Sequence, residues 1–112
     1  MTVLINQTGA CTTVPLALSS TTPTTLYTAT QFDAVLGLRV TNTHSSAVVV
    51  TVELVRSATS YAIIDQSVAA NTSIEGPDYL PMKEGDVLKV TLGSANPVDV
   101  VAIIMQGAGR NG

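Results

Sequence analysis

The chain contains one histidine and one cysteine, the side chains that most readily act as base and nucleophile in covalent catalysis. His44 stands in the polar stretch 42–46, and Cys11 stands among threonines near the N-terminus. A nucleophilic site needs its base beside its nucleophile, and nothing in the sequence links these two residues. We therefore interpret His44 as a solvated loop residue and Cys11 as a small buried hydrophobe, and we predict that the protein is not an enzyme.

Carboxylates gather in one segment of the chain. Calcium takes six to eight oxygen ligands, but the spacing of these carboxylates matches no calcium loop, and Lys83 stands among them. A zinc site needs about four His, Cys or carboxylate ligands at suitable spacing, which the chain lacks. We predict no metal and no cofactor, and we interpret the segment as a solvated turn region. Its acidic residues are Glu75, Asp78, Glu84 and Asp86.

The composition excludes several further classes of function. The chain has 112 residues, of which 46% are hydrophobic, 12% charged and 4% aromatic, with a net charge of −3. Five basic residues among eight acidic ones do not make the positive field that nucleic acid requires. We find no signal peptide and no apolar run of about 18 residues, so we expect no membrane partner. The length fits one domain, and a single cysteine suggests synthesis in a reducing cytoplasm.

Short apolar stretches that alternate with polar residues point to the elements of this domain. Thr and Val are the commonest residues, and both favour β-strands. The clearest alternation is Ala47–Arg56, and turn-forming clusters recur every 8–12 residues, as is typical of sandwiches and barrels. The sequence predicts an all-β, single-domain, two-sheet antiparallel β-sandwich, jelly-roll or Ig-like, with about eight strands and no substantial helix.

Two pairs of neighbouring strands are predicted to form hairpins. Leu36, Leu38 and Val40 alternate with Gly37, Arg39 and Thr41, and the short loop 42–46 joins them to Ala47–Arg56. Residues 87–92 are likewise predicted to pair with 98–105. Weaker strands are predicted at 2–5, 13–18, 24–30, 61–68, around residue 74 and at 79–82.

The N-terminal third is expected to lie at sheet edges. Pro15 and Pro23 lack the amide that a central strand donates to its neighbour. We therefore divide the single domain into an arm or edge strands at 1–22, packed on or exchanged with a neighbour, a sandwich core at 23–106, and a flexible tail at 107–112.

Two regions carry more apolar residues than one core uses. In the last strand Val101, Ile103 and Met105 make the second face apolar, and a strand that is apolar on both faces is covered on both. The row Val3, Leu4 and Ile5 is equally difficult to solvate. We predict that these six residues form an interface in a homo-oligomer; the alternative is an arm that folds over its own sheet.

The order of turns and strands resembles small β-sandwich virion proteins of tailed bacteriophages, of the head decoration or cement type. The resemblance covers residues 26–105 and is carried by four stretches: LYTAT (26–30), VLGLRVTNTHSSAVVVTVELV (35–55), ANTSIEGPDYLPMKEGDVLKV (70–90) and ANPVDVVAIIM (95–105).

This resemblance implies a capsid decoration protein that is made in the host cytoplasm and located on the capsid surface of the virion. Such a protein binds the major capsid protein of the assembled shell as a homo-oligomer, expected to be a trimer, and stabilises the shell. Two alternatives stay open. One is a neck or tail component of the virion; the other is a carbohydrate-binding or host-recognition module with Tyr27, Tyr61 or Tyr79 clustered on one side.

Overall fold

The computed structural model describes residues 11–107, and within that range the chain forms nine strands and no α-helix. The same residues contain no helix long and apolar enough to cross a membrane. The strands are β1 (Cys11–Leu18), β2 (Thr24–Thr28), β3 (Asp33–Asn42), β4 (Val48–Arg56), β5 (Thr59–Val68), β6 (Thr72–Glu75), β7 (Leu80–Met82), β8 (Val87–Leu92) and β9 (Val98–Met105).

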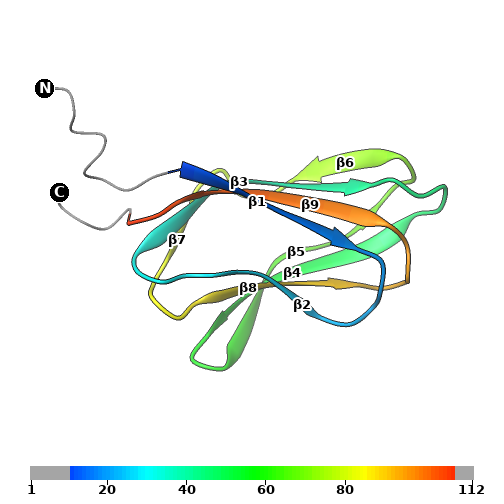
Figure 1. Ribbon diagram of the computed structural model, residues 1–112. Helices are drawn as coiled ribbons and strands as arrows, with labels where there is room; N and C mark the ends of the chain where they lie inside the picture. Colours follow the sequence, from blue (N-terminus) through cyan, green and yellow to red (C-terminus); the bar gives the residue numbers. More distant parts are fainter. Residues whose placement is uncertain (1–10, 108–112) are drawn as a thin grey trace, which may run out of the picture.

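The strands form two antiparallel sheets that pack face to face (Figure 1). One sheet has five strands in the order β1-β9-β3-β6, with β7 also paired to β3, and the other has four in the order β2-β8-β4-β5. The expected all-β, two-sheet antiparallel sandwich is confirmed.

The strand order distinguishes between the two sandwich types left open by the sequence. Strands β6 and β7 both pair with β3, so together they act as one strand that is interrupted at residues 76–79. If β6 and β7 are counted as one strand, the first of eight strands pairs with the last (β1 with β9) and the second with the seventh (β2 with β8). The third then pairs with the sixth (β3 with β6 and β7) and the fourth with the fifth (β4 with β5). This is the pairing of a long hairpin rolled into two sheets, which is a jelly roll.

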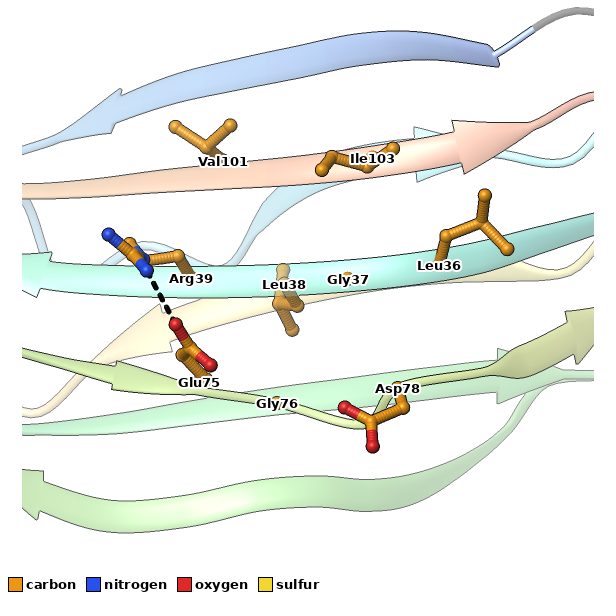
Figure 2. Close-up of a pocket in the computed structure, with 9 residues that line it drawn as sticks. All are labelled: Leu36, Gly37, Leu38, Arg39, Glu75, Gly76, Asp78, Val101 and Ile103. Carbon is orange, nitrogen blue, oxygen red and sulfur yellow. Dashed lines mark hydrogen bonds and ion pairs between the residues drawn. The ribbon is translucent and has the colours of Figure 1, made fainter.

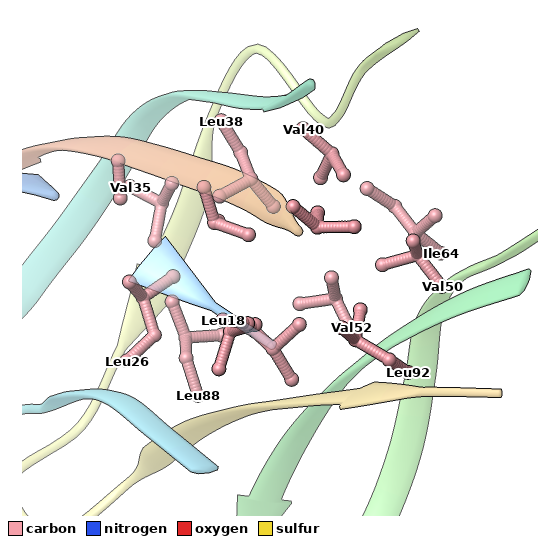
Figure 3. Close-up of a cluster of buried hydrophobic side chains, with 14 of the residues drawn as sticks. Leu18, Leu26, Val35, Leu38, Val40, Val50, Val52, Ile64, Leu88 and Leu92 are labelled. Atoms are coloured by element: carbon pink, nitrogen blue, oxygen red, sulfur yellow. The ribbon is translucent and has the colours of Figure 1, made fainter. Parts of the chain in front are cut away.

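One apolar core fills the space between the sheets (Figure 3). Alternate residues of β4 and β9 point inward, including Val50, Val52, Val100 and Ile104, and each of these side chains is completely buried. The period-two pattern of the sequence therefore corresponds to the inner faces of the sheets, as the pleat requires.

Both predicted hairpins are wrong. Strands β3 and β4 lie in different sheets, and so do β8 and β9. A short polar loop spans the gap of about 10 Å between packed sheets as easily as it reverses within one sheet, so loop length does not separate the two cases. The true hairpin is β4–β5, whose two-residue turn is Ser57-Ala58 with φ values of 53° and 66°. Those values match a type I′ turn, but the Asn-Gly signal of such turns is missing.

The edge strands at the N-terminal side agree with the proline argument. Strand β1, which contains Pro15, is the outer strand of the five-stranded sheet, and β2, which follows Pro23, is the outer strand of the other. Strand β1 pairs along its whole length with β9 of the same chain, so residues 11–18 are part of the sandwich. The strand predicted at 2–5 and residues 108–112 of the predicted tail lie outside the described residues.

Candidate functional site

The outer face of the five-stranded sheet carries the apolar residues that the core does not use. Val101 and Met105 are half-buried there, and Ile103 is 44% exposed. The alternate residues of the same strand, such as Val100 and Ile104, belong to the core. Strand β9 is therefore apolar on both faces, and the described residues leave its outer face partly uncovered. The other predicted interface residues, Val3, Leu4 and Ile5, lie outside the described residues.

A groove of about 460 Å³ runs along this outer face between β9 and the break between β6 and β7 (Figure 2). Val101 and Ile103 form one wall, and Leu36 of β3 closes it on another side. Gly37 and Gly76 also line it, and because Gly37 has no side chain the space above it is left open. The groove is apolar beside β9 and Leu36 and can accept a side chain or short segment of a partner.

A β-bulge in β3 places Leu36 in this groove. The register between β3 and β9 shifts between Val35 and Gly37. Val35 and Leu38 are both core residues although three positions separate them, so the simple alternation fails here. The prediction that Leu36, Leu38 and Val40 share one face is wrong for Leu36. The sequence reasoning also missed Gly37 and Gly76; the signal for Gly37 was a glycine within a predicted strand, whereas Gly76-Pro77 was interpreted as a turn.

Charged residues stand at the rim of the groove. The Arg39 guanidinium donates to the Glu75 carboxylate at 2.5 Å, across the pairing of β3 and β6 (Figure 2). Both side chains are mostly exposed, so the pair contributes little to folding. Asp78 also lines the groove. The rim offers a partner both signs of charge around an apolar floor.

The apolar surface continues across β9 toward β1. A second hollow of about 420 Å³ is lined by Pro15, Ala17, Asp99 and Val101, among others. Val101 lines both hollows. The candidate surface therefore extends over three neighbouring strands of the sheet, β1, β9 and β3.

His44 and Cys11 lie at opposite ends of the five-stranded sheet. Cys11 pairs with Met105, whereas Asn42, close to His44 in the chain, pairs with Val98. These two positions of β9 are seven residues apart in the chain, or about 23 Å at the usual rise of a strand. The two side chains therefore do not form a nucleophile and base pair. Cys11 is exposed, so its expected burial is wrong.

Hydrogen bonds give His44 a structural role in its loop. Its Nδ1 accepts from the Ser46 amide at 3.1 Å, and its own amide donates to the Asn42 Oδ1 at 2.9 Å. The Asn42 side chain is completely buried and donates to the carbonyls of Ser46 and Val68. This asparagine therefore ties the loop between β3 and β4 to the end of β5.

The carboxylates predicted to be solvated are divided among separate roles. Asp86 is almost fully buried, contrary to the expectation, and accepts from Arg56 through Nε and a terminal nitrogen at 2.6 to 3.1 Å. It also accepts from the Lys83 amide at 2.8 Å. Chiefly because of the Arg56 hydrogen bonds, the pKa of Asp86 is lowered, and the same contact raises the pKa of Arg56. Among residues 11–107, no three His, Cys, Asp or Glu side chains group closely enough to hold a metal ion.

A second buried carboxylate anchors the C-terminal end of β9. Asp33 accepts from the Tyr27 hydroxyl at 2.6 Å and from the Gly107 amide at 2.9 Å. Burial, together with the Asp33 contact, raises the pKa of Tyr27. Tyr27 and Tyr61 lie on β2 and β5, which are opposite edges of the four-stranded sheet. These two tyrosines therefore do not form one aromatic platform for a sugar.

Comparisons with known proteins give fold neighbours. No protein-family model matches the sequence, and no curated protein matches it. A pentameric capsid protein from metagenomic phage sequences has a TM-score of 0.55 at 21% identity, with 93% of this chain and 70% of that chain covered. A protein of Bacillus endospore appendages, described as a family of disulfide-linked pili, has a TM-score of 0.56 at 15% identity, with 88% of each chain covered.

A third neighbour comes from an icosahedral virus. A chain of the T13 IBDV viral particle has a TM-score of 0.53 at 14% identity; 92% of this chain is covered but only 34% of that one. At these identities the three likenesses establish the fold. Two of the three neighbours belong to viral capsids.

Proposed function

We propose that this protein is a phage virion structural protein, and specifically a capsid decoration protein that binds the assembled shell as a homo-oligomer. The observation that carries the proposal is the apolar outer face of the five-stranded sheet, with its groove and the 44% exposed Ile103. The fold neighbours from a phage capsid and a viral particle support it, and so does the sequence resemblance of residues 26–105 to virion proteins.

The mechanism requires only differential binding. A protein that binds the major capsid protein in the assembled shell, but not in its separated subunits, stabilises the shell by mass action. At a free concentration one hundred times the dissociation constant the gain is about 2.7 kcal/mol per site. Burial of apolar side chains in the groove supplies affinity without many charges, which fits a chain that is only 12% charged.

The oligomer is tested first, by light scattering on the purified protein. The resemblance leads us to expect a trimer, which at 11.6 kDa per chain has a mass of 3 × 11.6 = 34.8 kDa. The pentameric neighbour makes a pentamer of 5 × 11.6 = 58 kDa the alternative. A monomer at all concentrations contradicts the self-association that we propose.

Shell binding is tested with a pair of matched variants. Ile103 is 44% exposed on the five-stranded sheet, and Val49 is 45% exposed on the outward side of β4 in the other sheet. We expect Ile103→Asp to abolish co-sedimentation with capsid shells and Val49→Asp to leave it unchanged. Imaging of labelled protein on particles separates the roles: decoration gives hundreds of copies over the head, and a neck or tail component gives a few at one vertex.

A pilus-like filament subunit is the second candidate, favoured by one observation. The endospore appendage neighbour matches 88% of both chains, and its family is described as disulfide-linked. Here Cys11 is exposed at the start of β1. Because the chain has one cysteine, a disulfide can link only two copies, so this candidate predicts a disulfide-linked dimer of 2 × 11.6 = 23.2 kDa on a non-reducing gel after oxidation, which Cys11→Ser abolishes. Shell binding by an unlinked protein contradicts it.

A further inference from the structure

The four-stranded sheet ends in a long open edge at β5. Within residues 11–107, β5 pairs only with β4, so the other side of its backbone faces away from the sheet. Seven of its ten residues are exposed, and its sequence, TSYAIIDQSV, is rich in residues that favour strands. Near its end the Val68 carbonyl accepts from Asn42. Along the rest of the strand the edge presents amides and carbonyls to which another chain can add a strand.

The other three sheet edges are protected against such pairing. Strand β1 contains Pro15, and the five-residue β2 follows Pro23 and carries a bulge. The edge formed by β6 and β7 is interrupted at residues 76–79 and contains Pro81. Proline and short or broken strands are the usual devices that prevent edge pairing. Strand β5 also carries one bulge, at Ile63, but it is ten residues long, has no proline and no lysine, and its only charged residue is Asp65.

We propose that the N-terminal segment Thr2–Ile5 of a second copy of this chain adds a strand to the β5 edge. The segment reads TVLI, with three β-branched residues and no charge. Extended backbone from Cys11 to Ile5 spans about 20 Å, which is enough to reach beyond the domain that carries it. Backbone hydrogen bonds supply the affinity in this mode of recognition, and the apolar side chains gain burial.

The positions of the two partners in the sandwich determine the kind of assembly. Strand β1, from which the segment departs, lies at the edge beside β2, and β5 lies at the opposite edge beside β6. Each copy therefore gives its segment from one side and receives one on the other. Such a contact between unlike surfaces produces rings or filaments rather than two-fold dimers. The inference rests on the self-association in the proposed function and names the contact that produces it.

Disulfide cross-linking between two populations tests the contact. In a Cys11→Ser background, one copy carries Leu4→Cys and the other carries Ala62→Cys on the exposed part of β5. We expect oxidation of the mixture to give a linked pair of 2 × 11.6 = 23.2 kDa. The matched control is Thr25→Cys, an exposed residue on the opposite edge of the same sheet. We expect it to give at least tenfold less product.

A second measurement does not depend on a disulfide. Deletion of residues 2–5 is expected to reduce the oligomer to the monomer and to increase hydrogen exchange at β5 amides at least tenfold, with β8 amides unchanged. Equal cross-linking to Ala62 and Thr25, or linkage of Ala62 only to itself, overturns the proposal. If the wild-type protein is an oligomer and no Leu4–Ala62 link forms, the contact is wrong and self-association stands. A wild-type monomer overturns both.

Discussion

Replacing Gly37 with valine is expected to change folding stability and shell binding in opposite directions. Gly37 lies within β3, and its φ is outside the left-handed region, so the backbone does not require glycine there. A Cβ at this position would meet only the Ile103 Cδ1, at an ordinary 3.9 Å. Glycine inside a strand costs about 0.5–1 kcal/mol relative to alanine because it loses more backbone freedom on folding. We therefore expect Gly37→Val to raise the free energy of unfolding by about that amount.

The same valine occupies space that the proposed partner needs. Gly37 lines the middle of the groove of about 460 Å³, beside Leu36 and Ile103. Excluding one aliphatic side chain of the partner removes about 2 kcal/mol of apolar burial. Since 1.4 kcal/mol corresponds to a factor of ten, we expect the affinity for capsid shells to fall about thirtyfold.

Urea unfolding and shell co-sedimentation measure the two effects on the same protein. Thr91→Val, on the central strand β8 of the other sheet, is the control for adding an apolar β-branched side chain to an outer face. It should leave shell affinity unchanged. A stability loss of more than about 1 kcal/mol in Gly37→Val would refute the argument that the position tolerates a side chain. Unchanged shell affinity with raised stability would show that the groove is not the contact and would remove the observation that carries the proposed function.

Three further changes test the fold. Asp86→Asn should lower the free energy of unfolding at pH 7 by about 2 kcal/mol, because charge-assisted bonds to a buried carboxylate are lost. The folded-state pKa of Asp86 lies below its ordinary 3.8, so the contribution of this carboxylate to stability is complete above pH 3.8 and is lost as pH falls through the folded pKa. Urea titrations from pH 7 to 2 should therefore show that the difference in free energy of unfolding between wild type and Asp86→Asn shrinks only below pH 3.8. A difference that stays constant contradicts this. Ile104→Ala should cost 2–5 kcal/mol in the same assay, since the side chain is fully buried, and a loss under 1 kcal/mol would place Ile104 outside the core. Tyr27→Phe should cost about 1 kcal/mol and speed amide exchange at Gly107, because Asp33 loses one donor; unchanged exchange would show that Asp33 holds the end of β9 without Tyr27.

The sequence indicated which segments are strands better than it indicated their partners. Alternation predicted the residues of β3, β4, β8 and β9, because the inner face of a half-buried strand must be apolar. Pairing depends on which sheet receives the next strand, and a five-residue polar loop suits either choice. The turn that forms the true hairpin, Ser57-Ala58, has positive φ at both residues without the expected Asn-Gly. The two hairpins were predicted incorrectly because neither the length nor the sequence of a loop shows which sheet receives the next strand.

Only part of the candidate site could be predicted from the sequence, because alternation identifies outward residues only where the strand is regular. The outward residues of β9 could be identified because they repeat every second position, and Ile103 is exposed in the structure. Leu36 and Gly37 could not be placed, because a bulge shifts the register by one residue and moves Leu36 from the expected inner face. Asp86 was misread as solvated because its partner, Arg56, is 30 residues away in the chain.

The two outer faces of the domain differ in polarity, and this difference indicates which sheet binds the shell in the proposed function. On the four-stranded sheet Glu53 lies opposite Lys89, and Thr51 donates to Asp65, so polar and charged side chains stand on that face. On the five-stranded sheet the middle strand β9 presents Val101, Ile103 and Met105 outward instead. Water solvates the first face at little cost, whereas the second gains free energy when it is covered. A single-sided contact of this kind lets the protein bind a shell by one sheet while the other stays in solvent, and it requires that charge placed at Ile103 disrupts binding while charge at the equally exposed Val49 does not.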